Sequence, residues 1–334
     1  SRETTVWDAH LKAMAPVTVV DKSARTTIKC GSFKLELKNL PVFDVELPTP
    51  WDVEAHLFFT AETLGTILHR TCYCMSLDET RPNLNGAFLR FEPDALTIVA
   101  TDGHRLAVTR QDVEGPETPH DMIVGMKGVW EIERVVKANK KAVAWLALES
   151  ETVTPDKTTA NPNPKPWKTY RLRVTVGPDE VLTRGLDELY PDYTRVIPKR
   201  CPVRVDCAVS DLEAGMDAMR PWLDPKTRIV RFTVLPSALQ LNVSNPNGRE
   251  VTDEVVAVVS GLPEPRPAVP VLHADGSTTI EEGRPLRVGF NEAYFKDVTD
   301  RLTEKSMTIQ LADQFSPAKI QEGNTTHIVM PMRV

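Results

Sequence analysis

The apolar positions near the start of the chain change from a helical period to a strand period. Residues 5–15 carry apolar side chains at a spacing close to that of a helix, and Pro16 ends the run. Short apolar or alternating runs follow at residues 17–20, 26–30 and 33–37, which is typical of strands. The pattern therefore predicts one helix over residues 5–15 followed by a meander of strands.

Further helices are predicted along the rest of the chain. Thr60 is an N-cap candidate for a helix with the apolar stripe Leu64, Ile67 and Leu68. The other helices are expected near residues 127–138, 211–219 and 291–302. The expected buried side of the first of these is Val129, Trp130, Ile132, Val135 and Val136. Helices at comparable spacing, each trailed by strands, suggest a divergent internal repeat.

A hairpin with a polar turn is predicted after residue 95. Apolar strands at residues 95–100 and 106–109 flank Thr101-Asp102-Gly103, where the glycine permits a positive φ. Asp102, His104 and Arg105 could act as a base, a proton shuttle and an anion clamp of a hydrolase site. A solvated turn accounts for the same residues and is the favoured interpretation.

Proline-rich stretches divide the chain. Residues 44–52 and 196–202 are expected to separate domains, and the length of 334 residues suits two or three domains. Residues 154–167 and 261–276 fall inside domains and are expected to be long hairpin insertions. A proline-motif ligand for a partner is the alternative, and a surface loop is favoured.

Composition excludes several classes of protein. An apolar fraction of 41% and a charged fraction of 26% are those of an ordinary globular chain rather than a disordered one. The net charge of −6 argues against a protein that coats nucleic acid with a basic surface. It leaves room for a local basic face on an acidic body.

The cysteines and the apolar runs indicate a cytoplasmic protein without metal or cofactor. Five cysteines, without paired CxxC motifs, predict neither a disulfide framework nor a zinc site. Cys72 and Cys74 could be half a metal site, but buried apolar roles are favoured. We expect no membrane association, because no apolar run is long enough to span a bilayer and the N-terminus lacks the pattern of a signal peptide.

Four stretches together carry a resemblance to a known family. They are residues 81–86 (RPNLNG), 99–107 (VATDGHRLA), 190–198 (YPDYTRVIP) and 327–334 (HIVMPMRV). In this order they resemble the bacterial sliding clamp, the beta subunit of DNA polymerase III, from about Thr26 to Val334. Further matches lie at residues 289–294 and 313–317. No single motif is specific, but their order and the C-terminal position of Met-Pro-Met-Arg are.

The resemblance implies an α+β DNA clamp fold. Repeated units of helix and antiparallel sheet would form a crescent that closes into a ring by head-to-tail dimerisation. It implies that residues 1–52 are the second half of clamp domain I, residues 53–195 domain II and residues 196–334 domain III. The first half of domain I is absent from this sequence. If that absence is native, ordinary ring closure is in doubt, and if it is a truncation the intact protein would function normally.

The resemblance also implies a cleft for partner peptides. Its apolar wall would be Leu84, Leu106, Pro191, Val196, Ile328, Val329, Met330, Pro331 and Met332. Its polar margin would be Thr101, Gly103, His104, Arg105 and Arg195, with Asn291, Tyr294 and Pro317 nearby. Methionines adapt to varied apolar side chains, which suits a pocket shared by several partners. Without the other motifs, Met330-Pro331-Met332 would be taken for a plain edge strand.

The remaining implications concern DNA, partners and the dimer. Double-stranded DNA, bound without sequence preference, would face Arg70, Arg81, Lys127, Arg134, Lys137, Lys296 and Arg301, although each is equally well explained as a solvated charge. The homodimer interface would use Phe33 and Leu35 against Trp222 and Leu223, although Trp222 suits a core equally well. The protein partners would be the DNA polymerase III alpha subunit, the clamp loader, other polymerases, ligase and mismatch-repair proteins.

Two alternatives remain beside a non-enzymatic clamp. The first is a hydrolase using Asp102 and His104, for which the sequence has no G-x-S-x-G motif, phosphate-binding glycine loop or H-E-x-x-H helix. The second is a clamp-like paralogue that binds partner peptides without encircling DNA. The missing half-domain and the two insertions keep this second alternative open.

Overall fold

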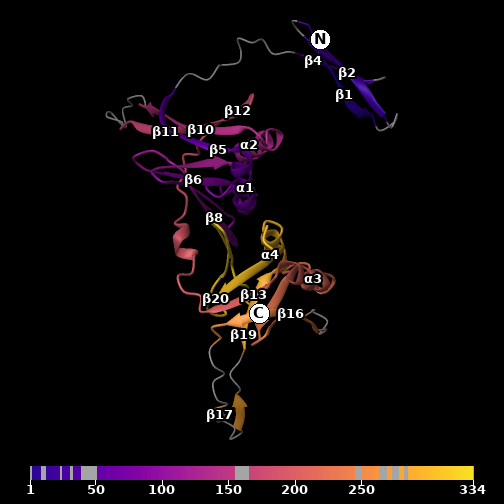
Figure 1. The fold of residues 1–334 in the computed structure, drawn as a ribbon, viewed down its shortest axis with the longest axis vertical. Coiled ribbons are helices and arrows are strands. Elements are labelled where there is room, and N and C mark those ends of the chain that lie inside the picture. The colour runs from indigo at the N-terminus through magenta and orange to yellow at the C-terminus, as the bar shows by residue number, and fades with distance from the viewer. Residues whose placement is uncertain are drawn as a thin grey trace. The chain divides into compact units, whose positions relative to one another are not determined.

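A computed structural model describes residues 2–8, 13–22, 25–30, 33–38, 51–154, 165–244, 250–262, 269–272, 278–281 and 285–333. Its contacts divide the chain into two units, Ser1–Trp51 and Asp52–Val334 (Figure 1). The two units are considered separately. Within the described residues, no helix is both long and apolar enough to cross a membrane.

The first unit is an antiparallel sheet in the order β1-β2-β3-β4. Its strands are β1 (Arg2–Asp8), β2 (Ala13–Lys22), β3 (Arg25–Cys30) and β4 (Phe33–Lys38). The helix predicted over residues 5–15 is therefore wrong, because Val6 pairs with Ala15 in a β1–β2 ladder. Four apolar positions in so short a window fit either period, and a β-branched run beginning at Thr4 favours a strand.

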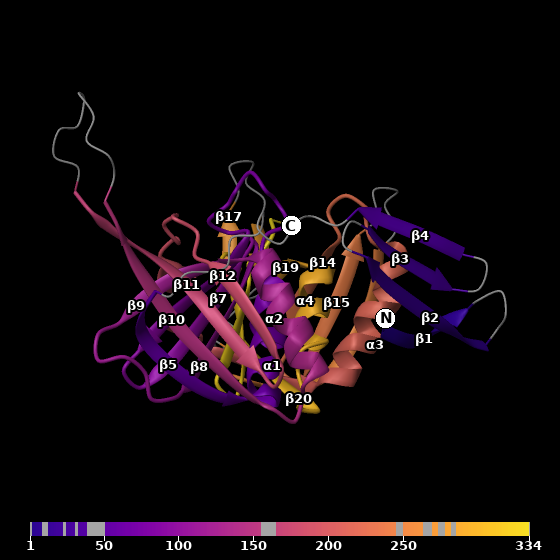
Figure 2. The ribbon, with the colours of Figure 1, turned by 90° about the horizontal axis from the view of Figure 1, so that it is seen from above.

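Two segments of the second unit share the same order of elements. The earlier segment contains β5 (Asp52–Thr60), α1 (Ala61–Thr71), β6 (Gly86–Glu92), β7 (Ala95–Thr101), β8 (Arg105–Asp112), β9 (His120–Gly125), α2 (Met126–Ala138), β10 (Val143–Val153), β11 (Trp167–Val176) and β12 (Asp179–Arg184). Its strands are ordered β12-β11-β10-β5 and β8-β7-β6-β9. Figure 2 shows β10 and β11 running side by side, as their antiparallel register requires.

The later segment repeats that pattern with one inserted pair of strands. It contains β13 (Val203–Ala208), α3 (Val209–Met219), β14 (Ile229–Val234), β15 (Ala238–Ser244), β16 (Glu250–Ser260), β17 (Val269–Leu272), β18 (Thr278–Glu281), β19 (Leu286–Asn291), α4 (Glu292–Thr299), β20 (Ser306–Leu311), β21 (Ala318–Glu322) and β22 (Thr325–Val329). Its strands are ordered β22-β21-β20-β13 and β16-β15-β14-β19, with β17 and β18 paired apart. The two segments therefore have one topology, and the predicted α+β class and internal repeat are confirmed.

Each segment has its own hydrophobic core. The first core draws its buried residues from between Ala55 and Val181, and the second core from between Val203 and Val329. Phe232, Phe290 and Phe295 lie in mutual ring contact in the second core. The domain boundaries given above stay a prediction, although the two cores lie on either side of the boundary after residue 195.

The helices of the second unit were predicted closely, although details differ. Thr60 caps α1 as predicted, because its hydroxyl accepts a hydrogen bond from the backbone N–H of Thr63 at 3.0 Å. Trp130 is 53% exposed, whereas its neighbour Val129 is buried, so its prediction as a core residue is wrong. Successive helical residues point about 100° apart and face different sides. The helix predicted to end at residue 302 ends at Thr299.

Two of the cysteines lie in the first core. Cys72 and Cys74 are buried in the first core, as predicted for small apolar residues. Burial raises the pKa of the Cys74 thiol to about 12, which keeps the thiol protonated at neutral pH. Much of the proline-rich segments 154–167 and 261–276 lies outside the described residues, so their predicted role as insertions stays a prediction.

Candidate functional site

The two segments are joined where β22 pairs with β8 (Figure 1). Leu106 lies opposite Ile328 in this ladder, and Arg105 lies opposite Val329. The pairing makes one twelve-stranded sheet out of strands from both segments. Residues that are more than 200 positions apart in sequence, such as Leu106 and Ile328, therefore become neighbours.

A third apolar cluster covers this joint. We call it the seam cluster, and its buried members are Phe88, Val99, Leu106, Ile123 and Ile328. Partly buried side chains packed against it include Leu186, Tyr190, Tyr193, Ile197 and Met330. Leu106 belongs to the seam cluster, whereas its neighbour Ala107 belongs to the first core. Alternate residues of a strand point to opposite faces, so the seam cluster lies on the face of β8 away from that core.

The predicted turn forms between β7 and β8 and uses Asp102 as a cap. The carboxylate Oδ1 of Asp102 accepts hydrogen bonds from the backbone N–H groups of His104 at 2.8 Å and Arg105 at 3.0 Å. Gly103 has a φ of 91°, as the turn prediction required. Because Asp102 is engaged in the turn and in an ion pair with Arg105, the geometry does not favour its use as a hydrolytic base.

Arg105 connects the turn to the helix α4. Its guanidinium bonds Asp297 on α4, Asp102 at 3.1 Å and the backbone oxygen of Tyr73 at 3.3 Å. It also lies 5.2 Å from the ring centroid of Tyr73 and 5.0 Å from that of Tyr294, so two aromatic faces enclose it. Only 14% of the side chain is exposed. Arg105 is thus a structural link, and its predicted bond to a partner peptide stays a prediction.

The backbone of the C-terminal residues is bonded to this turn and to the strand β19. The backbone N–H of Met330 donates to the oxygen of His104 at 2.9 Å, and that of Met332 donates to the oxygen of Gly289 at 2.7 Å. The rings of His104 and Tyr294 are stacked with centroids 5.9 Å apart. The structure therefore brings together His104, Arg105, Leu106, Tyr294, Ile328 and Met330, and it places Met332 beside Gly289. That these residues form a cleft for partner peptides stays a prediction.

Other predicted cleft residues have different surroundings. Val329 is fully buried in the second core and faces away from the seam cluster, so its place in the apolar wall is wrong. The side chain of Asn291 caps α4 by accepting from the N–H of Ala293 at 2.9 Å. Arg195 is 83% exposed and bonds Asp192 at 2.9 Å. Thr101 is buried, Gly103, Pro191 and Val196 are exposed, and Leu84, Pro317 and Pro331 are half-buried, with their roles still predictions.

Three of the predicted DNA-facing cations are held by other side chains. Arg70 is 15% exposed and bonds Glu322 at 2.7 Å and Thr303 at 2.8 Å. Arg301 lies 4.9 Å from the ring centroid of Tyr73. Lys296 pairs with Glu213 at 3.4 Å and with Asp300. Arg70 and Arg301 thus connect the two segments, and for these two the prediction of a DNA-facing role is not supported.

The remaining cations lie on exposed surface. Lys127, Arg134 and Lys137 are on the exposed side of α2, where Arg134 pairs with Glu131 and Lys137 with Glu133. Arg81 is exposed and pairs with Asp78 at 3.5 Å. Exposed ion pairs of this kind are weak, so these cations can exchange partners. Their predicted contact with DNA stays a prediction.

The residues predicted for a dimer interface are mostly exposed. Phe33 and Leu35 are 60% and 39% exposed on β4, an edge strand of the first unit. Trp222 is 38% exposed. Leu223 instead packs into the second core, which leaves Trp222 as the member of that pair able to contact another subunit.

Sequence reasoning missed a buried histidine beside the seam. His327 is fully buried, its Nδ1 lies 3.1 Å from the hydroxyl of Tyr73, and its Nε2 has no hydrogen-bond partner among the described residues. Burial lowers the pKa of His327 to about 4. Its position in a short strand, where side chains alternate between the two faces, was the available signal of burial. Nothing in the nearby sequence indicated that the hydroxyl of Tyr73 would lie next to its ring.

Because His327 is buried in its neutral form, we expect the folded protein to lose stability in mild acid. The unfolded chain binds a proton at His327 near pH 6.5, whereas the folded chain does so only near pH 4. Stability therefore falls as the pH is lowered from about 6.5, by about 2 kcal/mol at about pH 5 from this group alone. The free energy of unfolding, measured with urea at several pH values in this range, should depend less steeply on pH for His327→Gln than for the unchanged chain. Equal slopes would contradict the assignment.

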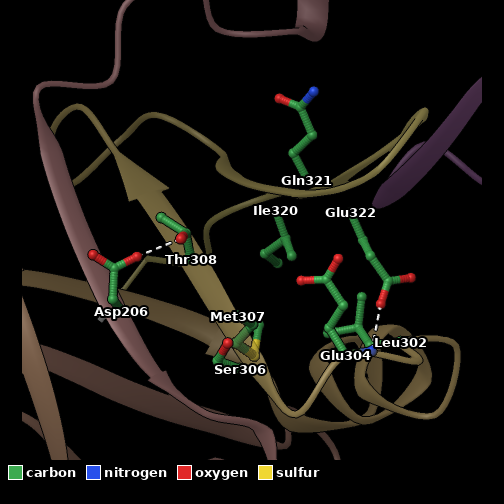
Figure 3. A pocket seen from close by; sticks show the side chains of 9 residues that line it. All are labelled: Asp206, Leu302, Glu304, Ser306, Met307, Thr308, Ile320, Gln321 and Glu322. Atoms are coloured by element: carbon green, nitrogen blue, oxygen red, sulfur yellow. Dashed lines mark hydrogen bonds between the residues drawn. The ribbon is translucent and has the colours of Figure 1, made fainter.

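One cavity lies near β20 and another lies beside the seam cluster. The first, of about 120 Å³, is lined by Asp206, Leu302, Glu304, Ser306, Met307, Thr308, Ile320, Gln321 and Glu322 (Figure 3). Its Glu322 is engaged by the backbone N–H groups of Thr303 and Glu304, both at 2.7 Å, which indicates a structural role. The second, of about 430 Å³, lies beside Tyr190 and Pro191 and shares Pro191 with the predicted cleft.

Comparisons with known proteins agree with this geometry. Residues 59–192 match the family described as DNA polymerase III beta subunit, central domain. The beta sliding clamp of Salmonella typhimurium is 25% identical over 323 residues, which cover 96% of this chain and 77% of that protein.

Solved structures are similar in fold. The DNA polymerase III beta subunit of Thermotoga maritima matches with a TM-score of 0.74 at 20% identity, over 96% of this chain and 76% of that one. A sliding clamp of Pseudomonas aeruginosa bound to griselimycin matches with a TM-score of 0.74 at 23% identity, over 96% and 77%.

Proposed function

The chain belongs to the family of bacterial sliding clamps, the beta subunits of DNA polymerase III, and we propose that it holds a replicative polymerase on duplex DNA. It does so without catalysing a reaction. On this proposal it acts in the cytoplasm. Topological enclosure keeps a protein on DNA without tight contacts, and contacts to phosphates carry no sequence information.

The convergence of the turn, α4 and the C-terminal residues supports a site for partner peptides. Met330 and Met332 are half-buried and unbranched. Met330 packs against the buried cluster that includes Leu106 and Ile328, and the backbone of Met332 is bonded to Gly289 of β19. His104 and Tyr294 present ring faces at the margin. We propose that the polymerase III alpha subunit, the clamp loader, other polymerases, ligase and mismatch-repair proteins each dock a short apolar peptide here.

Ring closure and DNA contact form the second part of the proposal. The edge strand β4 would meet the surface around Trp222 of another subunit, head to tail, and the exposed side of α2 would face DNA. This arrangement assigns residues 1–52, 53–195 and 196–334 to clamp domains I, II and III. Retention on circular but not on linear DNA after loading would support the ring. Loss from both would favour a clamp-like paralogue that binds peptides without encircling DNA.

Peptide binding is the most direct test of the proposed function. We expect a fluorescently labelled clamp-binding peptide of the polymerase III alpha subunit to bind saturably, as measured by anisotropy. Changing Met332 and Arg195 together to alanine should weaken binding by about tenfold or more, because the site would lose an adaptable apolar wall and a marginal charge. Lys127→Ala, on the exposed side of α2, is the matched control and should leave the affinity unchanged.

Two outcomes would count against the peptide site. If the folded, unchanged chain does not bind the peptide, the proposed site is wrong. If the double variant and Lys127→Ala both bind as tightly as the unchanged chain, the peptide binds elsewhere. Thermal unfolding of each variant separates lost binding from lost folding.

A further inference from the structure

The second cavity has a wall of aromatic and aliphatic side chains. Its apolar lining includes Phe88, Met122, Ile123, Leu186, Tyr190 and Tyr193. Tyr190 stacks on Phe88 with ring centroids 5.0 Å apart, and its hydroxyl reaches the backbone oxygen of Val99 at 3.5 Å. The aromatic wall is therefore fixed to the sheet. A volume of about 430 Å³ is within the range of small-ligand pockets and exceeds what a single water requires.

The cavity and the proposed peptide site rest on the same seam cluster. Phe88 and Ile123 line the cavity and belong to the same buried cluster as Leu106 and Ile328. Tyr190 packs on that cluster, as does Met330 of the peptide site. One buried apolar cluster thus lies beneath both, and Pro191, which lines the cavity, is also predicted for the peptide site.

The rim of the cavity carries an acidic charge that the surrounding cations do not neutralise. Arg90 is held by Asp121 in two hydrogen bonds of 2.8 and 2.7 Å. Asp192 pairs with Arg195. Glu188 is exposed and forms no ion pair within the described part of the chain. With both arginines already paired, Glu188 attracts a cation.

An exposed leucine lies beside that acidic rim. Leu189 is 89% exposed, and its backbone oxygen accepts a hydrogen bond from the amide of Asn83 at 3.5 Å. Exposure of a single leucine is ordinary, but here it adjoins an apolar cavity and an acidic side chain. The combination suits a segment that carries an apolar side chain next to a basic one.

We propose that this cavity is a second subsite for the partner peptide, and that it takes a flanking segment with an apolar residue beside a lysine or arginine. The apolar side chain enters between Phe88, Met122 and Tyr193, and the cation pairs with Glu188. This inference rests on the proposed function, because the flank reaches the cavity from a peptide held at the seam. The subsite distinguishes partners by what lies outside their shared apolar motif.

Peptides of different length test the subsite. The probes are the labelled core peptide alone and the same core extended, at either end in turn, by a linker with Leu-Lys or with Leu-Glu. We expect one Leu-Lys extension to tighten binding by about tenfold and the corresponding Leu-Glu extension to tighten it much less. Glu188→Lys should abolish the gain from Leu-Lys while binding the core peptide as before.

Matched variants separate the subsite from general charge effects. Glu254→Lys makes the same change on the exposed surface of β16, outside the cavity lining, and should retain the full gain. Tyr193→Ala should remove the apolar part of the gain, with thermal unfolding confirming that the variant is folded. If no extension tightens binding, or if Glu188→Lys keeps the gain, the subsite is wrong while core binding still supports the proposed function. Failure of the unchanged chain to bind the core peptide would overturn both.

Discussion

Arg105→Ala is expected to lower the free energy of unfolding by about 3 to 5 kcal/mol, the cost typical of breaking a buried ion pair by removing one partner. The side chain is only 14% exposed and bonds Asp102 and Asp297 from two different elements. Its removal leaves Asp102, which is 17% exposed, without its cation. It also leaves a gap between the rings of Tyr73 and Tyr294.

Another arginine of the same strand provides the matched control. Arg110 lies on β8, pairs with Glu92 at 3.3 Å and Asp94 at 3.0 Å, and is 44% exposed. Exposed pairs contribute little, so Arg110→Ala should cost about 1 kcal/mol or less. Urea unfolding of both variants measures the difference. Equal costs would mean that Arg105 is not the structural link inferred from its contacts.

Loss of this link should also weaken the peptide site. Arg105 holds α4, which carries Tyr294, against the turn that carries His104. Without it the ring stack at the margin of the site loses its support. Asp297→Asn is a milder change of the same contact. We therefore expect it to reduce the free energy of peptide binding, measured by anisotropy, by more than it reduces the free energy of unfolding, measured with urea. This distinguishes positioning from a general loss of folding.

Phe295→Ala is expected to have a comparable effect on stability, about 3 to 5 kcal/mol, because it leaves a cavity in a well-packed core. The ring of Phe295 is fully buried and lies 4.8 Å from that of Phe232 and 4.9 Å from that of Phe290, measured between centroids. Two rings would lose their contact at once. Their positions on strands limit how far the core can close around the gap.

An exposed phenylalanine gives the matched control for this substitution. Phe315 is 73% exposed, so Phe315→Ala should change the free energy of unfolding by only about 0.5 kcal/mol. Hydrogen exchange adds a second readout, since Phe295→Ala should reduce protection in the second core more than in the first. A uniform loss across both cores would contradict the separation of the two cores.

Local sequence determined the elements whose interactions lie within a few residues. The helix α1 begins after Thr60 because the cap and the N–H it binds are three residues apart. The turn at Asp102 forms for the same reason. The helix α2 was predicted to within one residue from its apolar period. The order of four short motifs further identified the family, because those motifs can be recognised without knowing what they contact.

Only the tertiary structure decided which residues face each other across the chain. Val6 belongs to a strand because Ala15 lies opposite, which a short window with an ambiguous period cannot show. The sequence predicted that Arg70 faces DNA and that Arg105 lies at the margin of a peptide cleft. In the structure they bond Thr303 and Asp297, which are 233 and 192 residues away. The pairing of β22 with β8, which are far apart in the sequence, brings these residues together and forms the seam cluster. Whether a side chain is buried or paired with a charge depends on such neighbours, and sequence spacing does not specify them.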